Sequence, residues 1–197
     1  MIIFWRKSLV MLSVPKTGTH SYIDHLQYHA DIVIKHPQNL KHMGIKQFNK
    51  KILPLFPNQE TDIDYFGYIR NPADWLWSWY RYRSRPEINN RPSSTAGISF
   101  RQFIDDYLDP NTPPHANVGR QSSILTSSNP NISANIIFKY ENRDTANSYL
   151  SQRLGIAVNP DKFLNRSPVM NSCISKEEVA ILERSIPFEF ELYESAV

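Results

Sequence analysis

The sequence predicts a three-layer α/β domain with a mostly parallel central sheet. Four short apolar runs have the length of buried strands, and they span 9–14, 31–35, 64–70 and 134–140. Each run is followed along the chain by a segment whose apolar residues recur with helical spacing. Strands that alternate with helices are typical of parallel sheets, because parallel neighbours need a crossover connection that usually contains a helix. The length of 197 residues fits a single domain over 1–197.

Capping residues and helix breakers mark the limits of the predicted helices. A loop that carries Lys41 and His42 precedes a helical pattern over 45–56, and Ser99 is a favourable N-cap for a helix that extends to Leu108. The segment 116–126 is expected to be helical again. Gly155 ends the helix that follows the fourth strand, because glycine tolerates the left-handed conformation at a helix C-terminus. The capping box at 175–178 opens a C-terminal helix.

The composition restricts the class of protein. An apolar share of 41% with 12% aromatic residues is that of a globular protein. A net charge of +3 means that any affinity for anions must come from local clusters of cations. Cys173 is the single cysteine, which excludes an intrachain disulfide and a metal site built on thiolates. No signal-peptide core and no apolar run of the ~18 residues needed to cross a membrane is present, so we expect a cytoplasmic protein.

The first candidate site lies in the segment Ser8–Tyr22. The strand 9–14 stops at Pro15, and Lys16–Ser21 then turns the chain into a helix. Such a turn directs backbone N–H groups and the positive helix end at one point, and Lys16 adds a full charge, so a phosphate would fit there. Lys16 precedes the only glycine of the turn, unlike the lysine of a Walker A motif, so we expect phosphate binding without a Walker-type metal. An ordinary strand-to-helix turn is the alternative.

The second candidate site follows the strand 64–70, which ends in Arg70. Asn71 is a good N-cap and Pro72 suits the first helical position, so a helix should start directly after the arginine. Ser78 lies on the same helix, eight residues after Arg70. An arginine at the strand end and a serine on the following helix can hold a second anion between them.

These two motifs resemble those of the sulfotransferases that use 3′-phosphoadenosine 5′-phosphosulfate (PAPS). The 5′-phosphosulfate loop of that family has the form PK-[ST]-G-T, and it is similar to residues 15–19. Its 3′-phosphate motif has an arginine followed eight residues later by a serine, and it is similar to Arg70 and Ser78. The order and the spacing of the two motifs are also those of the family.

Further segments extend the resemblance over most of the chain. Phe138–Glu141 is similar to the family's strand that ends in Tyr-Glu-Asp, and Lys41–Met43 and Phe163–Pro168 resemble segments of small bacterial sulfotransferase-like proteins. Two residues depart from the pattern. His20 stands where many relatives carry Thr or Ser, and Asn142 replaces the usual Asp.

The resemblance implies a P-loop NTPase-like topology and PAPS as the sulfuryl donor, with no metal. The residues that would bind the 5′-phosphosulfate are those of the turn: Lys16, Thr17, Gly18, Thr19, His20 and Ser21. Arg70 and Ser78 would bind the 3′-phosphate. Tyr140 would lie near the nucleotide, with a tyrosine of the core as the alternative. Arg166 would lie in a late nucleotide-binding loop.

The expected reaction is transfer of the sulfuryl group to a hydroxyl or an amine of an unidentified acceptor, such as a glycan or a small molecule. Lys16 would neutralise the charge on the departing 5′-phosphate. A base must remove the acceptor's proton, and histidine is the usual base near neutral pH. His42 is the first candidate, because its position resembles that of the small bacterial group, and His20 is the second. His36 and His115 are expected at the surface.

Two other classes of function fit parts of the pattern. A P-loop-like kinase would use ATP, but the Walker order and a clear magnesium partner are missing. A non-catalytic module for nucleotides or nucleic acids would combine aromatic side chains with arginines. The modest net charge of +3 and the lack of a nucleic-acid-binding motif argue against nucleic acid.

The segment that follows Arg70 leaves two questions open. Arg81, Arg83 and Arg85 either extend the PAPS site, bind an acidic acceptor such as a glycan, or end a solvated helix. The long polar loop 84–97 is either a lid over the acceptor or a plain surface loop. The helical spacing of the apolar residues in this segment favours burial in the core; they are Trp75, Leu76, Trp79 and Tyr80.

Overall fold

The computed structural model describes residues 1–56, 62–127, 133–160 and 174–197 of the chain. These residues form two compact units. The first unit comprises the described residues within 1–70, 121–165 and 195–197, and the second comprises those within 71–120 and 166–194. The first unit contains the sheet, and the second is built around helices. The single domain expected over 1–197 stays a prediction.

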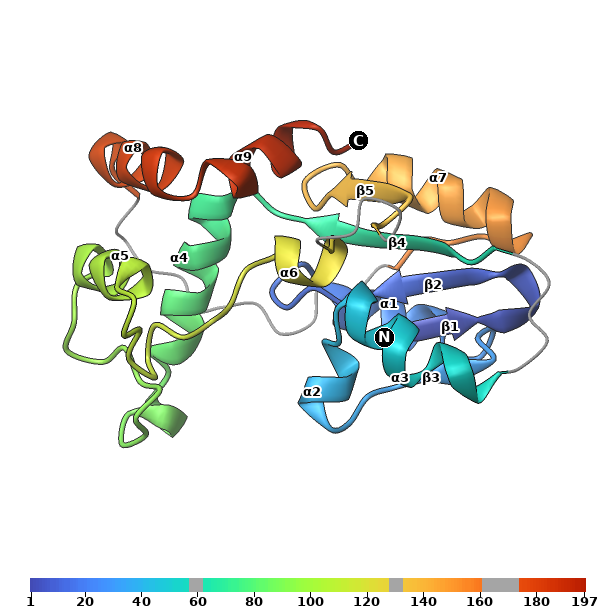
Figure 1. The fold of residues 1–197 in the computed structure, drawn as a ribbon, viewed down its shortest axis with the longest axis horizontal. Coiled ribbons are helices and arrows are strands. Elements are labelled where there is room, and N and C mark those ends of the chain that lie inside the picture. The colour runs from blue at the N-terminus through green and yellow to red at the C-terminus, as the bar shows by residue number, and fades with distance from the viewer. Residues whose placement is uncertain (57–61, 128–132, 161–173) are drawn as a thin grey trace. The chain divides into compact units, whose positions relative to one another are not determined.

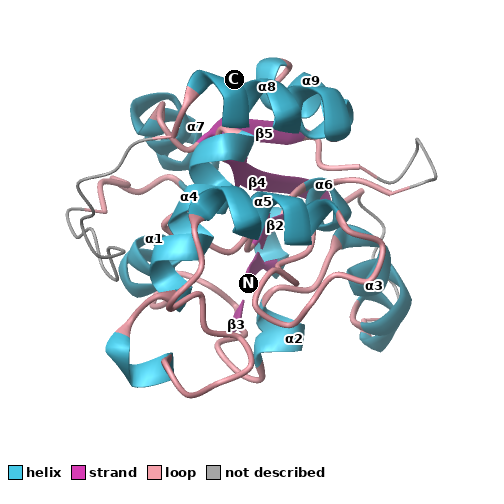
Figure 2. Cartoon of the chain, turned by 90° about the vertical axis from the view of Figure 1, so that its left-hand side faces the viewer, coloured by secondary structure: helices cyan, strands magenta, loops and turns pink. Residues whose placement is uncertain are grey.

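The described residues of the first unit form one five-stranded sheet from β1 (Ile2–Phe4), β2 (Leu9–Leu12), β3 (Ile32–Val33), β4 (Asp64–Ile69) and β5 (Ile136–Lys139). The strand order is β3-β1-β2-β4-β5, and Figure 2 labels β5, β4, β2 and β3 in this sequence across the sheet. β4 pairs in parallel with β2 and with β5, whereas β1 is antiparallel to β2 and β3. Four strands therefore run in one direction and β1 in the other, which confirms the predicted α/β fold.

β1 is a strand that the sequence analysis does not predict. Its three residues are too few to show a period, and Arg6 and Lys7 interrupt the apolar stretch that follows them. The 3₁₀ turn η1 (Trp5–Lys7) and the left-handed Ser8, with a φ of 48°, reverse the chain. β1 then pairs with β2 as a hairpin, with Ile2 opposite Met11. The antiparallel strand is thus a local addition to a parallel arrangement.

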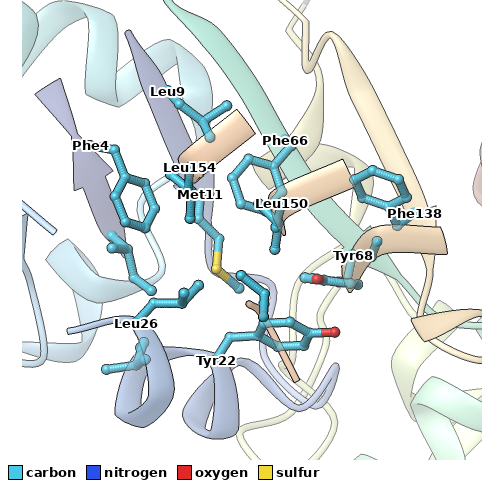
Figure 3. Close-up of a cluster of buried hydrophobic side chains, with 14 residues drawn as sticks. Phe4, Leu9, Met11, Tyr22, Leu26, Phe66, Tyr68, Phe138, Leu150 and Leu154 are labelled. Carbon is cyan, nitrogen blue, oxygen red and sulfur yellow. The ribbon is translucent and has the colours of Figure 1, made fainter. Parts of the chain in front are cut away.

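One face of the sheet is covered by α1 (Thr19–Leu26) and α7 (Arg143–Leu154). Their buried side chains share a core cluster with alternate strand residues, and Figure 3 labels ten members: Phe4, Leu9, Met11, Tyr22, Leu26, Phe66, Tyr68, Phe138, Leu150 and Leu154. Tyr22 of α1 stacks on Tyr68 of β4 with 4.8 Å between the ring centroids. This cluster fixes the start of α1 against the sheet, and the first candidate site lies at that start.

The opposite face of the sheet is covered by α3 (Ile45–Lys51), which continues into the 3₁₀ turn η2 (Leu53–Leu55), and by α6 (Ser122–Leu125). Phe48 of α3 meets the ring of Tyr65 edge-on, with centroids 5.7 Å apart. Gly67 of β4 lies under Leu125 of α6, so that a Cβ at this position would overlap the leucine side chain. Helices on both faces give the three predicted layers, and α7 can be followed beside β4 and β5 in Figure 1.

Two segments differ from the prediction. The helix expected over 116–126 is limited to the four residues of α6, because the chain before Gln121 is extended or turned. Lys41, which was expected in a loop with His42, ends the short helix α2 (Gln38–Lys41) instead. The other expected elements of the first unit are present, with a shorter helix than the pattern 45–56 indicates.

The second unit contains α4 (Pro72–Arg83), the 3₁₀ turn η3 (Pro86–Ile88), α5 (Phe100–Leu108), α8 (Lys176–Ser185) and α9 (Pro187–Glu194). The predicted caps are confirmed. The Asn71 side chain accepts from the backbone N–H groups of Ala73 and Asp74, at 3.1 and 3.3 Å, and so starts α4 directly after Arg70. Ser99 caps α5, and the capping box of Ser175 opens α8.

The aromatic residues of α4 pack in the core of the second unit. Trp75, Leu76 and Tyr80 are buried, as their spacing predicts, and Trp79 packs against the same cluster. Helices α4, α5 and α8 all contribute to this cluster. These side chains are therefore part of the scaffold rather than a platform for stacking bases.

Candidate functional site

The turn between β2 and α1 has the backbone of an anion-binding loop. Lys16 and Gly18 both have positive φ angles, of 66° and 70°. Gly18 is the N-cap of α1, and no described side chain caps the helix. The first N–H groups of a helix lack intrahelical acceptors, and together with the helix dipole they attract anions. The loop is therefore suited to a phosphate or a sulfate, as the sequence predicts.

Two hydroxyls of the loop hold the loop itself. Thr17 is fully buried and its hydroxyl donates to the backbone oxygen of Val14 at 2.9 Å. The hydroxyl of Ser21 donates to the backbone oxygen of Gly18 at 3.0 Å. Thr17 would therefore meet an anion through its backbone N–H, whereas the N–H of Ser21 already donates to the backbone oxygen of Gly18 at 3.1 Å, so the predicted donor role of Ser21 is not supported. The bonds keep the turn in shape, and a preformed loop pays less reorganisation on binding.

Gly18 lies directly under two side chains from the end of β5 and the start of α7. A Cβ built on Gly18 would overlap a guanidinium nitrogen of Arg143 and would come within 3.1 Å of the Tyr140 ring. A glycine suits both this close approach and the positive φ. The loop is thus packed from its N-cap against a tyrosine and an arginine.

Arg70 is held by its backbone and leaves its side chain at the end of β4. The backbone N–H of Arg70 donates to the side-chain oxygen of Gln121 at 3.0 Å, and the side-chain nitrogen of Gln121 donates back to the Arg70 oxygen at 2.8 Å. The guanidinium lies 5.2 Å from the centroid of the Tyr140 ring. Its Nε is buried and has no hydrogen-bond partner among the described residues. A buried donor of this kind is costly until an acceptor reaches it, and a phosphate oxygen fits.

The sheet places the two predicted cations at one edge. β2 and β4 are neighbours in parallel register, from Leu9 opposite Asp64 to Leu12 opposite Gly67. Lys16 follows the carboxyl end of β2 and Arg70 follows that of β4. Ligands of parallel sheets bind at this edge. The parallel pairing of β2 with β4 thus brings the ends of the two strands to one edge of the sheet.

His42 is oriented by a backbone oxygen at the end of β2. Its Nδ1 lies 2.6 Å from the oxygen of Ser13. A carbonyl oxygen only accepts hydrogen bonds, so Nδ1 carries the proton and Nε2 keeps its lone pair. Burial lowers the pKa of His42 to about 4, so the ring is neutral at physiological pH. A neutral, oriented imidazole is ready to accept a proton at Nε2.

His20 and Lys41 form a contact next to this histidine. The Lys41 side chain is 2% exposed, and its Nζ lies 2.7 Å from Nε2 of His20. An ammonium only donates, so Nε2 of His20 is the acceptor and its lone pair is occupied. Partial burial, followed by the Lys41 charge, lowers the pKa of His20. With this nitrogen engaged, His20 is the weaker candidate for a base.

The remaining predicted site residues lie on three different segments of the chain. Tyr140 follows β5, is half-buried, and donates its backbone N–H to the oxygen of Ile69 at 2.7 Å. Ser78 lies on α4 in the second unit and is 4% exposed. Arg166, together with the motif 163–168, lies outside the described residues.

The arginines at the end of α4 are engaged within the second unit. Arg83 donates to the backbone oxygens of Pro114, His115 and Asn117 at 2.7, 2.7 and 3.0 Å. Arg85 lies over the Tyr82 ring, 3.8 Å from its centroid. Three carbonyl acceptors make Arg83 a structural residue, since its donors are used to hold the loop before Gln121.

A model described as the Sulfotransferase family matches residues 1–184. No match was found among curated proteins or among solved structures. The matched range includes the loop after β2, the end of β4 and the segment after β5. The chain belongs to the sulfotransferase family, and sulfotransfer is its class of activity.

Among the described residues, no cluster of His, Cys, Asp or Glu reaches the three side chains that a metal ion would need. None of the helices in this part of the chain has both the length and the apolar character required to cross a membrane.

Two residues that contact the predicted site residues escape sequence reasoning. Arg143 is the third residue after Tyr140, and it belongs to none of the motifs that carry the resemblance. Gln121 is distant in sequence from the Arg70 that it holds. A cation close behind a motif tyrosine is a weak signal for the first, and no sequence signal marks the second, because its pairing depends on the tertiary fold.

We predict that Gly18→Ala destabilises the protein more than Gly155→Ala. Gly155 has a φ of 74°, and no described atom lies within 4 Å of a Cβ built on it, so its substitution reports the strain of a positive φ alone, about 1 kcal/mol. Gly18→Ala adds the overlap with Arg143. Urea unfolding of both variants gives the two free energies of unfolding. Equal losses would show that the Arg143 contact does not constrain the loop.

We also predict that His42 makes the stability depend on pH. Its folded pKa of about 4 lies below the ordinary 6.5, so the unfolded chain takes up the proton first as the pH falls. The contribution of His42 is fully present above the unfolded pKa and is lost as the pH falls through the folded pKa. His42→Asn keeps a donor for Ser13 but does not titrate. Its free energy of unfolding should fall less between pH 7 and pH 4.5 than that of the wild type; parallel curves would contradict the assignment.

Proposed function

We propose that the protein transfers a sulfuryl group from PAPS to a hydroxyl or an amine of an acceptor. One observation carries the proposal: a loop for a phosphate or sulfate and a strand-end arginine with a buried, unsatisfied Nε follow neighbouring parallel strands. PAPS has phosphate groups at both ends of one ribose, so two anion sites at one sheet edge suit it. Membership of the sulfotransferase family supports the reaction.

The loop after β2 would bind the 5′-phosphosulfate. Backbone N–H groups of Thr17, Gly18, Thr19 and His20 would donate to its oxygens, and Lys16 would add a positive charge. Ser21 would support the turn through its two bonds to the Gly18 oxygen. The two positive φ angles and the uncapped helix start support this role.

The 3′-phosphate would be bound by Arg70, with Ser78 as its second donor, and Arg166 would contribute from the late loop. Arginine suits this role, because its planar guanidinium can make two parallel hydrogen bonds to a phosphate. The buried Nε of Arg70 supports it. Tyr140, whose ring contacts the guanidinium, would lie beside the nucleotide.

In the proposed reaction the acceptor oxygen or nitrogen forms a bond to sulfur, and the bond between sulfur and the bridging phosphate oxygen breaks. Negative charge then develops on the 5′-phosphate, and Lys16 would stabilise it. His42 would accept the acceptor's proton at Nε2. The bond from Nδ1 to Ser13 supports this assignment, because it holds the ring and leaves Nε2 to the reaction.

The low pKa of His42 has a consequence for its role as a base. An imidazole with a pKa of about 4 is neutral and available but weakly basic. An anionic donor next to the ring favours the imidazolium and raises the pKa. Binding of PAPS would therefore strengthen the base at the moment when it is needed.

The acceptor remains unidentified, and a glycan or a small molecule is proposed from the family alone. Arg83 donates to three carbonyl oxygens of its own unit, which argues against its use for an acidic acceptor. The loop 84–97 stays a candidate lid, and the cytoplasm stays the expected location.

Calorimetry with three ligands tests the proposed donor. Adenosine 3′,5′-bisphosphate should bind tightly with or without Mg²⁺, because lysine, arginine and backbone donors neutralise its charge. ATP with Mg²⁺ and a single-stranded oligonucleotide are the controls. A preference for ATP with Mg²⁺ would indicate a kinase, and a steep salt dependence with the oligonucleotide would indicate a nucleic-acid-binding module. Either result would overturn the proposal.

We predict that His42→Ala lowers kcat by roughly 10²- to 10⁴-fold, the range that a general base contributes. Affinity for adenosine 3′,5′-bisphosphate should stay within about twofold, because His42 is not part of the loop that binds the phosphosulfate. Transfer of label from PAPS, to the first acceptor that a screen returns, measures kcat. His29→Ala, at an exposed histidine, is the matched control. A loss in kcat below about tenfold would remove His42 from the base role.

A further inference from the structure

A cation that belongs to none of the sequence motifs lies on the phosphate loop. Arg143 is the first residue of α7, and its guanidinium occupies the space that a Cβ on Gly18 would need. The contact is between residues 125 positions apart, so the tertiary fold alone creates it. Gly18 is the N-cap of α1, so the guanidinium lies beside the N–H groups that would bind an anion.

Two tyrosine rings fix the position of this guanidinium. Its central carbon lies 5.6 Å from the centroid of Tyr22 and 5.1 Å from that of Tyr140. Tyr22 is fully buried and is held through its hydroxyl, which donates to Asn147 at 2.8 Å. Cation–π contacts hold a guanidinium in place and leave its in-plane N–H groups directed away from the ring face. Arg143 is thus oriented by the faces of two aromatic rings.

The same tyrosine ring also contacts Arg70. The central carbon of Arg70 lies 5.2 Å from the centroid of Tyr140, against 5.1 Å for Arg143. The guanidinium that follows β4 and the one from α7 therefore both lie close to the Tyr140 ring. Lys16 lies in the loop that Arg143 covers. Because like charges repel, a bound anion would stabilise this cluster of cations. The ligand of this edge should carry several negative charges.

We propose that Arg143 is a further donor-binding residue and that it contacts the 5′-phosphate end of the nucleotide. The inference rests on the proposed function. The contact with Gly18 assigns Arg143 to the 5′ end, since Gly18 belongs to the loop that would hold that group. Arg70, at the end of β4, serves the 3′-phosphate. Among the described residues, Lys16 and Arg143 then supply the 5′ group with two full positive charges, and Arg70 supplies the 3′ group with one.

Two nucleotides used as ligands distinguish the proposed role of Arg143 from that of Arg70. Adenosine 5′-monophosphate has only the 5′ group, and adenosine 3′,5′-bisphosphate has both. Arg143→Met should weaken both by roughly ten- to a hundredfold, the effect of losing a charge-assisted hydrogen bond. Arg70→Met should weaken the bisphosphate by a similar factor and leave the monophosphate within about twofold. Calorimetry measures the four dissociation constants against the wild type.

Two further variants serve as controls. Arg153→Met removes the same charge from the same helix, at a side chain whose Nη2 lies 2.6 Å from Asp64, and should leave both affinities unchanged. Arg143→Lys keeps the charge but not the planar fork, and should lose less affinity than Arg143→Met. Far-ultraviolet circular dichroism shows whether Arg143→Met folds. If it does not, Arg143→Lys tests the role of Arg143 in its place.

The outcomes distinguish this inference from the proposed function. If the wild type binds neither nucleotide, the proposed function fails and the inference fails with it. If the wild type binds both and the Arg143 variants bind them within twofold, only the inference is overturned. A loss confined to the bisphosphate would also overturn it, because Arg143 would then act at the 3′ end.

Discussion

The parallel pairing of β2 with β4 is the constraint on which the candidate site depends. It brings the carboxyl ends of two strands that are more than fifty residues apart to one edge, with Leu12 opposite Gly67. Lys16 and Arg70 follow these ends, so each cation needs only a short connection to reach the edge. A shift of the register would separate them, and burial of alternate residues on both faces resists such a shift.

The edge is held mostly by bonds to backbone atoms. The Thr17 hydroxyl bonds to the backbone oxygen of Val14, and the His42 ring bonds to that of Ser13. The Gln121 side chain makes two hydrogen bonds to the backbone of Arg70. Backbone acceptors are fixed by the sheet and the turn, so they position side chains without adding further charge. Arg70 and Arg143 both contact the Tyr140 ring, and these cation–π contacts stabilise the two guanidinium groups at the edge. Such an edge is prepared for an anion before the anion arrives.

The sequence predicts the parts of this arrangement that local patterns encode. Strand and helix limits follow from apolar runs and from caps such as Asn71 and Ser99, and these caps are present. The prediction misses β1, whose three residues show no period, and extends the helix that is limited to α6. Both errors have the same cause: short elements are stabilised by their neighbours, and a local pattern does not contain those neighbours.

For the site, the sequence alone determines which residue types follow which strand, and with them the family and the two candidate anion sites. Only the tertiary structure decides that Arg143 covers Gly18 and that Gln121 bonds to the backbone of Arg70. It also decides that His42 bonds to Ser13 through Nδ1, whereas Nε2 of His20 accepts from Lys41. The physical reason is the range of the interactions. Turns, caps and strand ends are set by neighbours in the chain, whereas tautomers, pKa values and packed cations depend on atoms that folding brings from distant segments.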